Sequence, residues 1–394
     1  MDARVKTGLE VFVDKIPIWA RGRKAALLCH QASVDKDLCH SRERLSQILG
    51  KDLVCLFSPQ HGLFAEKQDN MVESSDEIDP DTGLPVYSLY GSTREPKQAH
   101  LSGIDLFIID LQDVGCRVYT YVWTMLLVMR ACARHGKAVA ILDRPNPIGG
   151  LQVEGNILSK DQYSFVGMAP IPMRHGMTIG ELALLLKEVE GLDLELHVVP
   201  MKGWERWMYF DQTGLPWVWP SPNMPALDTA IVYPGQVVLE GTNLSEGRGT
   251  TRPFEVFGAP YIDSIWLKAK LEGLGLTGVV FRPQYFEPTF NKWQGQRCKG
   301  FQIHVTDRLG FRPYLTTLLL LSLIIVHHKD RFEWKAPPYE YEHERLPADL
   351  IIGDSSLRQA VEWGIGPEEL FSMFEKDQKD FLELRQPYLL YDIG

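Results

Sequence analysis

The sequence predicts an α/β fold built on an open, mostly parallel sheet, and two observations support this class. Four short runs are almost continuously apolar and end in polar residues, at 24–30, 52–57, 104–110 and 137–143. Strands of this kind are covered on both faces, which is typical of parallel sheets. Helical patterns separate the runs, and this alternation predicts a Rossmann-like sheet with helices on both faces.

Each predicted helix is marked by its own spacing and end signals. "SRERLSQIL" (41–49) follows the first strand, and "YTYVWTMLLVMRACARHG" (119–136) follows the third and ends in glycine, as helices often do. Thr178 and Glu181 are spaced as a capping box at the start of another helix. The apolar run from Tyr314 is shorter than the ~20 residues of a membrane span, so we expect a buried helix there.

The chain has 394 residues, which is long for a single hydrophobic core. From about residue 170 the sequence pattern changes, and loops rich in Pro, Gly and Trp follow. We therefore expect a Rossmann-like catalytic domain over 1–225 and a smaller α+β domain over 226–394 that contributes to the active-site cleft. The second domain is expected to contain a strand at 300–307.

Composition limits the partners and cofactors. The net charge is −10 with no Lys/Arg cluster, which argues against a nucleic-acid partner. The N-terminus lacks an apolar segment of signal-peptide length, so we expect a cytoplasmic location and no membrane partner. The chain has no C-x-x-C pair, His175 has no second histidine at metal-ligand spacing, no G-x-G-x-x-G follows the first predicted strand, and no P-loop pattern occurs, so no metal and no cofactor are predicted. The oligomeric state is left open.

Polar loops follow the second, third and fourth predicted strands. Ligands on open parallel sheets bind beyond the carboxyl ends of the strands, so we expect these loops to meet at one edge and form a site. The candidates that they supply are Gln60, His61 and Glu66 in the first loop, Asp110, Asp113, Arg117, Tyr119 and Tyr121 in the second, and Arg144 and Asn146 in the third.

Several of these residues also have an ordinary structural explanation. Asp113 stands where a helix N-cap would stand, and Arg117 can pair with a neighbouring aspartate as readily as with a substrate carboxylate. Turn chemistry explains Asn146 but explains Arg144 less well, so Arg144 stays a candidate for binding an anionic group. His175, just before a predicted helix, suits acid–base work or a hydrogen bond to substrate more than a metal.

The motifs, taken in order, resemble the NamZ-like exo-β-N-acetylmuramidase family. The matching stretches are "SPQHGLF", "PVYSLYG", "GIDLFIIDLQDVGCRVYTYVWTM", "ILDRPNPIGG", "VGMAPIPMRHGMTIGELA", "SPNMP", "EGTNLSEGRGTTRPFEVFGAPY", "CKGFQIHV" and "RQPYLLY". They span nearly the whole chain and include Asn223, Glu246 and Arg248, which we take as substrate-binding candidates. The resemblance implies hydrolysis of terminal, non-reducing β-1,4-linked N-acetylmuramic acid from peptidoglycan fragments, a role in cell-wall salvage. The lactyl carboxylate of N-acetylmuramic acid would need arginines close by to bind it.

One position departs from the family pattern. The block that reads "PQHG" here commonly reads "PEHG", and its Glu is a suspected catalytic acid, whereas this chain has Gln60. An amide neither donates nor accepts a proton at neutral pH, so the chemistry must move or be lost. Glu66, in the same loop, is the nearest replacement, with Asp110 or Asp113 as its partner and Tyr119 or Tyr121 positioning substrate.

Two alternatives to a glycosidase are left open. The substitution at Gln60 also fits a catalytically silent protein that binds muropeptides or regulates, and the same scaffold also suits a hydrolase of another class.

Overall fold

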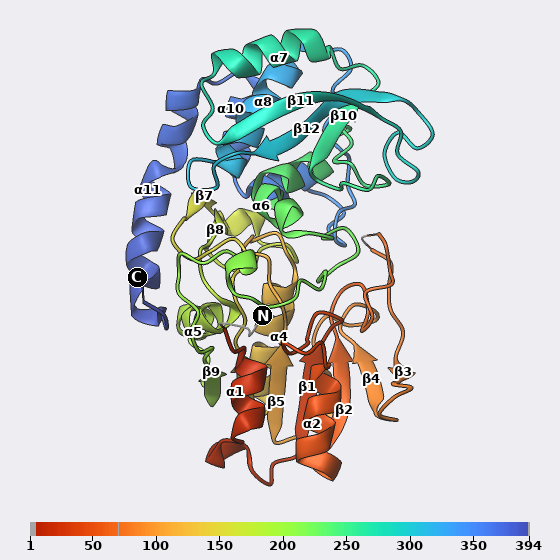
Figure 1. Cartoon of the computed structure of the whole chain (residues 1–394), viewed down its shortest axis with the longest axis vertical. Helices are drawn as coiled ribbons and strands as arrows, with labels where there is room; N and C mark the ends of the chain where they lie inside the picture. Colours follow the sequence, from red (N-terminus) through yellow and green to blue (C-terminus); the bar gives the residue numbers. More distant parts are fainter. Residues whose placement is uncertain (1–4, 70, 393–394) are drawn as a thin grey trace.

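The computed structural model describes residues 5–69 and 71–392, and within these residues the chain forms a large sheet of seven strands, a small sheet of three and a two-stranded pair. Figure 1 shows the large sheet in the lower half of the molecule and the small sheet in the upper half. In the order in which they lie side by side, the strands of the large sheet are β3 (Glu77–Ile78), β4 (Pro85–Ser88), β2 (Leu53–Ser58), β1 (Ala25–Cys29), β5 (Leu106–Asp110), β6 (Ala138–Leu142) and β9 (Leu196–Val199).

The large sheet is covered on both faces, as its uninterrupted apolar strands predicted. Ala26 and Leu28 of β1 pack into one hydrophobic cluster, while Leu27 and Cys29 pack into another on the opposite face. The first cluster is completed by helices α4 (Tyr121–Arg134) and α5 (Ile179–Val189), and the second by α1 (Gly8–Asp14) and α2 (Ser41–Leu49). Both side-chain directions are therefore buried, which removes the alternation of polar and apolar residues.

Pairing in the large sheet is parallel except between the short edge strand β3 and β4. The predicted strands are confirmed as β1, β2, β5 and β6, and the predicted helices as α2 and α4. The capping box that opens α5 is also confirmed, because the Thr178 side chain accepts from the Glu181 amide and Glu181 returns the bond to the Thr178 amide.

The second half of the chain forms the small antiparallel sheet and the helices around it. Strand β12 (Cys298–Val305) lies between β10 (Val256–Ala259) and β11 (Val279–Phe286), and β12 contains most of the strand expected at 300–307. Strands β7 (Glu154–Ile157) and β8 (Pro172–Arg174) form the separate pair. The remaining helices are α3 (Gln98–Leu101), α6 (Leu227–Gln236), α7 (Ser264–Gly273), α8 (Pro313–His327), α9 (Pro347–Ile352), α10 (Ser355–Glu362) and α11 (Pro367–Arg385).

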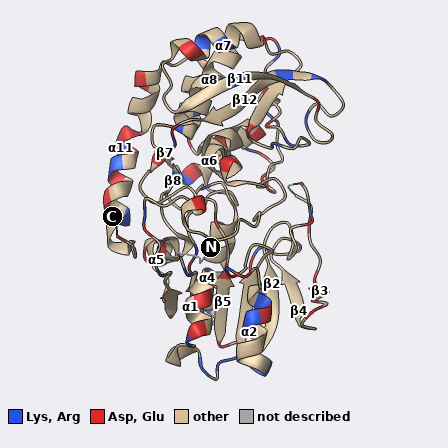
Figure 2. Ribbon diagram, viewed as in Figure 1, with Lys and Arg blue, Asp and Glu red and all other residues tan. Residues whose placement is uncertain are grey.

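Two of these helices tie the halves together. Helix α8 is the predicted apolar helix, and it lies buried between α6, α7, α10 and α11. Among the described residues, no helix is long and apolar enough to cross a lipid bilayer. Helix α11 runs down one flank of the molecule and packs on β7, β8 and α8 (Figure 1). Acidic and basic residues are interleaved along α11 (Figure 2).

The carboxyl edge of the large sheet faces the second half of the chain. Strand β1 lies between β2 and β5, so the chain leaves β1 toward one side of the sheet and later returns on the other. In open α/β sheets, such a reversal point is where loops diverge and leave room for a ligand. The loops after β2 and β5 diverge at this place.

Candidate active site

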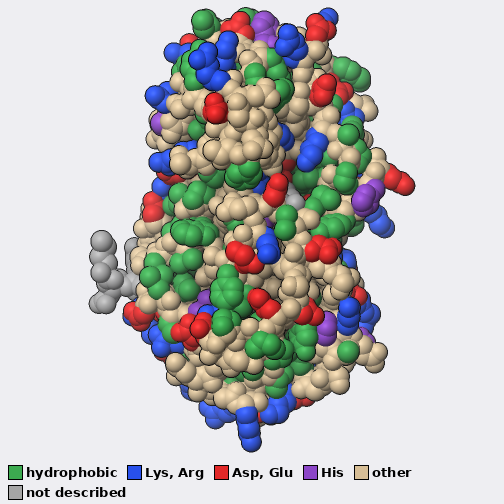
Figure 3. Space-filling view, turned by 90° about the vertical axis from the view of Figure 1, so that its right-hand side faces the viewer, with side chains coloured by type: hydrophobic (Ala, Val, Ile, Leu, Met, Phe, Trp, Pro, Cys, Tyr) green, Lys and Arg blue, Asp and Glu red, His purple; other side chains and the backbone are tan. Residues whose placement is uncertain are grey.

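A cavity lies where the loops after β2 and β5 meet the second half of the chain. It opens into a wider, charged recess, here called the vestibule, and Figure 3 shows acidic and basic side chains gathered at this waist between the two halves. The cavity is lined by Gln60, His61, Val118, Tyr119, Thr120, Tyr121, Val166, Ser221, Asn223, Met224, Tyr233, Glu240, Arg248, Phe254, Tyr339 and Glu340. The vestibule is lined by Asp69, Met71, Glu240, Glu246, Arg248, Asn291, Lys292, Lys335 and Tyr339.

Gln60 joins the two halves at the cavity. Its Oε1 accepts a hydrogen bond from Thr120 Oγ1 (2.6 Å), so its Nε2 is directed the other way. Nε2 donates to Glu340 Oε1 (3.0 Å) and to the Tyr90 hydroxyl (3.1 Å), and the Tyr90 hydroxyl donates to Glu340 Oε2 (2.6 Å). Both oxygens of Glu340 are therefore held by the first half of the chain.

Glu340 is buried and has an altered acidity. Burial raises the pKa of its carboxyl to about 6, and the hydrogen bonds from Tyr90 and Gln60 act in the opposite direction. The backbone is also unusual, since Glu340 has φ +46° and the next residue, Tyr341, has φ +66°. Two consecutive non-glycine residues in the left-handed region are costly, and such conformations concentrate at functional sites.

A second carboxylate, Glu240, lines the same cavity in a network of charges. Its Oε1 accepts from Arg248 Nη2 (2.6 Å) and its Oε2 accepts from the Tyr339 hydroxyl (2.7 Å). Arg248 Nε also lies 3.2 Å from Glu246, which pairs with Lys292 Nζ at 2.8 Å. Burial would raise the pKa of Glu240, but Arg248 and these hydrogen bonds outweigh it and leave the pKa below its ordinary value.

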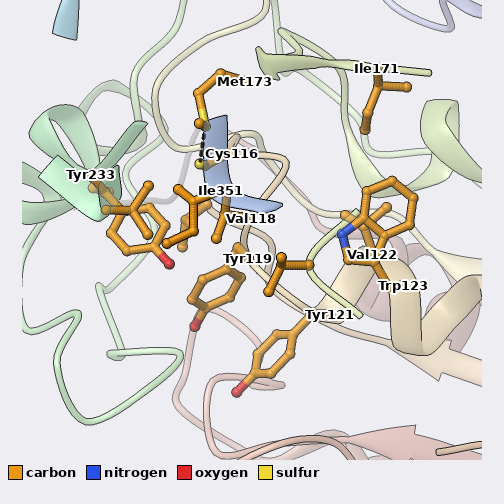
Figure 4. Packing of buried hydrophobic residues seen from close by; sticks show 14 of the residues in the cluster. Cys116, Val118, Tyr119, Tyr121, Val122, Trp123, Ile171, Met173, Tyr233 and Ile351 are labelled. Atoms are coloured by element: carbon orange, nitrogen blue, oxygen red, sulfur yellow. Dashed lines mark hydrogen bonds between the residues drawn. The ribbon is translucent and has the colours of Figure 1, made fainter. Parts of the chain in front are cut away.

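Three tyrosines form an aromatic wall of the cavity. The ring centroids of Tyr119 and Tyr121 are 4.8 Å apart, and those of Tyr119 and Tyr233 are 5.9 Å apart. Figure 4 shows the hydroxyls of Tyr119 and Tyr121 pointing away from Trp123 and to the same side. The fully buried Trp123 fixes the start of α4 by donating from Nε1 to the carbonyl of Arg117 (2.8 Å). The tyrosine positions are thus set by the core.

The loop of residues 59–69, here called the β2 loop, supplies two lining residues and leaves Glu66 outside. His61 has φ +74°, and its Nδ1 lies 2.6 Å from the Lys67 carbonyl, which can only accept, so Nδ1 carries a proton. Burial lowers the pKa of His61 to about 4, which fits the neutral form. Glu66 does not line the cavity, its side chain is 53% exposed, and its nearest charge is Lys67 at 3.7 Å.

The aspartates that the sequence singled out lie in a separate group, here called the sheet-edge network. Arg144 makes two bonds to Asp110, Nε to Oδ1 (2.6 Å) and Nη2 to Oδ2 (2.9 Å), and both residues are buried. Asp113 Oδ2 accepts from the Gly115 amide (2.7 Å) and lies 3.2 Å from His175 Nε2. None of these side chains lines the cavity.

Two further candidates also bond to the protein rather than to the cavity. Arg117 is fully buried and donates from Nη2 to the carbonyls of Ile351 (2.9 Å) and Ile352 (3.0 Å). Asn146 donates to the Met177 carbonyl (2.9 Å) and accepts from the Ile148 amide (3.1 Å). The loops after the strands do meet at one edge, but the loop after β6 supports the edge without reaching the cavity.

Of the sequence candidates, the structure brings six together at the cavity: Gln60, His61, Tyr119, Tyr121, Asn223 and Arg248. Glu246 lies in the vestibule beside them. Sequence reasoning missed Glu340, although the alternating "YEYEHE" at 339–344 is unusual for a surface turn. Glu240 begins the stretch "EGTNLSEGRGTTRPFEVFGAPY", whose glycines and polar side chains are typical of a loop that lies against a ligand.

Two buried carboxylates with pKa values moved apart inside one cavity define the kind of site that acid–base hydrolases, glycosidases among them, use. The chain belongs to the family of the exo-beta-N-acetylmuramidase NamZ. The family models for the N-terminal and C-terminal parts match residues 25–228 and 231–391.

Individual relatives agree with this assignment over the whole chain. The chain is 41% identical over 388 residues to the peptidoglycan beta-N-acetylmuramidase NamZ of Bacillus subtilis (strain 168), covering 98% of this chain and 92% of that protein. Two crystal structures of DUF1343 family proteins from Bacteroides fragilis NCTC 9343 have the same fold. One has a TM-score of 0.88 and 35% identity, with 99% of this chain and 100% of that chain covered. The other has a TM-score of 0.76 and 30% identity, with 99% of each chain covered.

Proposed function

We propose that the protein hydrolyses terminal, non-reducing β-1,4-linked N-acetylmuramic acid from peptidoglycan fragments, and that the reaction takes place in the cavity between the two halves. Family membership supports the reaction class. The observation that carries the placement is the pair Glu340 and Glu240, which line one cavity and whose pKa values are moved in opposite directions. Such a divergence separates the acid from the base in carboxylate pairs.

Glu340 is the proposed general acid. With a pKa of about 6 it keeps a proton to higher pH than an ordinary glutamic acid. In the reaction it transfers this proton to the glycosidic oxygen as the bond to the anomeric carbon breaks, so that the leaving sugar departs as a neutral alcohol. This assignment replaces Glu66, whose exposed side chain lies outside the cavity.

Glu240 is the proposed carboxylate partner. Arg248 and Tyr339 hold it ionised, as either a general base for water or a nucleophile requires. Tyr119, Tyr121 and Asn223 line the same cavity and supply hydroxyl and amide groups suited to sugar hydroxyls. His61, neutral and with Nε2 as an acceptor, is a further partner for a sugar hydroxyl.

The Gln60 position is consistent with activity in this arrangement. Gln60 cannot transfer a proton, but its Nε2 holds Glu340 from 3.0 Å. The acid function that a Glu at this position would have is therefore proposed to lie on the adjoining Glu340. A silent, binding-only protein would not need a second carboxyl with a raised pKa at this place.

Substrate entry requires movement at the cavity. The cavity has about 30 Å³ of room for water-sized solvent and the vestibule about 230 Å³, both below the ~300 Å³ at which small-molecule sites begin. The β2 loop is tied across the opening by two bonds at its exposed end, from Asn223 Nδ2 to the Gln68 carbonyl (3.0 Å) and from Asn291 Nδ2 to Asp69 (3.3 Å). We propose that this loop opens to admit the sugar.

Incubation with a MurNAc–GlcNAc disaccharide, in which N-acetylmuramic acid is the non-reducing sugar, tests the proposal. Release of both free sugars is the expected result. Binding of the disaccharide, seen as thermal protection, without any release on prolonged incubation would instead establish the silent homologue. Turnover of an ester or phosphate panel with no release from the disaccharide would establish a hydrolase of another class.

The proposal includes a cytoplasmic location and a carbohydrate substrate, with no cofactor, nucleic-acid or membrane partner. The cysteines among the described residues are all free thiols, which fits a reducing compartment. Fractionation of cells that express the full-length protein tests the location.

A further inference from the structure

Three buried arginines were candidates for an anionic part of the substrate, and the structure separates them. Arg144 donates from Nε and Nη2 to Asp110, and Arg117 donates to the carbonyls of Ile351 and Ile352, and neither arginine lines the cavity. Arg248 is the one of these three that lines the cavity. It also lines the vestibule, so it stands at the boundary between them.

The guanidinium of Arg248 is held firmly on two sides. Nη2 bonds Glu240 at 2.6 Å, Nε lies 3.2 Å from Glu246, and the carbon of the group lies 5.3 Å from the ring centroid of Phe254. The third nitrogen, Nη1, is buried and has no hydrogen-bond partner among the described residues. Arg248 itself is 7% exposed. A buried charged donor without a partner is costly, so a fixed open donor at this place suits a ligand acceptor.

The charges of the vestibule beside Arg248 are balanced. The network pairs Glu240 and Glu246 with Arg248 and Lys292, so its formal charges balance. Lys335 lines the vestibule as well and lies 6.0 Å from the ring of Tyr339, which adds positive charge at the rim. Asp69 lines the vestibule too, so its three acidic and three basic side chains balance, and a carboxylate that reaches Nη1 from the cavity meets a fixed donor in a recess of no net formal charge.

We propose that Arg248 Nη1 receives the lactyl carboxylate of N-acetylmuramic acid and that this contact makes the site specific for this sugar over N-acetylglucosamine. The inference rests on the proposed function. The two sugars differ by the lactyl ether. One unpaired arginine donor at the cavity boundary is therefore enough to distinguish them, because only N-acetylmuramic acid has a carboxylate that can accept from it. A site built around a charged donor rejects an analogue that leaves the donor unpaired.

The test measures binding and does not require turnover. Calorimetry on the wild-type protein compares N-acetylmuramic acid with its methyl ester, in which the carboxylate charge is removed, and with N-acetylglucosamine. The acid should bind on the order of 10- to 100-fold more tightly than either neutral ligand, as expected for a hydrogen bond between charged groups. Equal affinities for the acid and its methyl ester would overturn the proposal, whatever the protein does to the disaccharide.

Two variants then assign the contact to Arg248. R248K, which lacks Nη1 but keeps a positive charge, should lower affinity for the acid and leave affinity for the methyl ester within a few-fold. E246Q, which removes the negative charge beside Arg248 Nε and keeps Nη1, should preserve the preference for the acid. An R248K protein that loses both affinities alike would show that Arg248 acts through Glu240, and the proposal would fail. Failure of wild-type protein to release free sugar would count against the proposed function alone.

Discussion

Two groups of buried charges lie near the carboxyl edge of the large sheet, and they differ in what their charges face. In the sheet-edge network, Asp110 and Arg144 pair with each other through two bonds and do not line the candidate active-site cavity. At the cavity, Glu340 is held from one side by Gln60 and Tyr90 and faces open space on the other. Buried charges that are mutually satisfied hold loops in place, whereas a held carboxyl with a free side is available for chemistry.

The largest expected effect comes from removing the proposed acid. E340Q keeps the size and the hydrogen bond from Gln60 but cannot transfer a proton. We expect kcat for a chromogenic N-acetylmuramoside with a poor leaving group to fall by about 10²–10⁴-fold, with little change in KM. E66Q is the matched control, because it makes the same change at an exposed glutamate, and its rate should stay near that of wild type. A large loss in E66Q with a small loss in E340Q would restore Glu66 as the acid.

The second prediction breaks the sheet-edge network. D110N leaves Arg144 buried beside a neutral amide, and breaking one side of a buried pair costs about 3–5 kcal/mol of unfolding free energy. Urea denaturation, followed by circular dichroism, measures this loss. The protein that remains folded should keep most of its specific activity. If D110N kept its stability and lost turnover by orders of magnitude, Asp110 would be a reacting carboxylate and the contrast between the two groups would disappear.

The same contrast explains which parts of the fold and of the candidate site could be predicted from the sequence. The strands and helices were predictable because hydrophobic periodicity and end signals are local in the sequence. Strands β1, β2, β5 and β6 are continuous apolar runs, and the capping box of Thr178 and Glu181 marks the start of α5. The loops that follow the strands were predictable from the sheet geometry. Gln60, Tyr119 and Tyr121 could therefore be chosen as site residues, whereas Arg248 was chosen from the motif that carries the family resemblance.

What could not be predicted is which loop residues face the cavity. Glu340 stands 280 positions after Gln60 in the chain, and nothing local connects them. Glu66 was preferred because it is near in sequence, but the left-handed turns at His61 and Ala65 carry the β2 loop so that Glu66 points to solvent. Asp110 looked reactive because its tertiary partner, Arg144, could not be assigned from spacing alone.

The third prediction concerns the pH dependence that Gln60 sets. In wild type, kcat/KM should fall as pH rises through about 6, because the acid form of Glu340 is lost there. Tyr90 and Gln60 lower this pKa by hydrogen bonding, Arg94 lowers it by charge and Glu240 raises it. Q60L removes one donor to the ionised form, so the pKa rises and the alkaline limb should move up by about 1 pH unit.

A pH profile of kcat/KM measures this shift, and Q284L, the same change on strand β11 outside the cavity, should leave the limb in place. Movement of the limb to lower pH in Q60L would mean that Gln60 stabilises the protonated carboxyl instead. An unmoved limb would mean that another group controls the profile.

The smallest effect is expected from breaking an ion pair that is exposed to solvent, for comparison with the buried pair of Asp110 and Arg144. Lys379 Nζ lies 2.9 Å from Glu375 on the outer face of α11, four residues apart, with side chains 69% and 46% exposed. K379Q should lower the unfolding free energy by only about 0.3–0.5 kcal/mol, because solvent replaces the lost partner and salt screens the pair. Urea denaturation at low and high salt measures it, and the difference from wild type should shrink at high salt. A loss as large as that in D110N would show that burial is not what distinguishes the sheet-edge pair, because an equally short contact in solvent would then contribute as much.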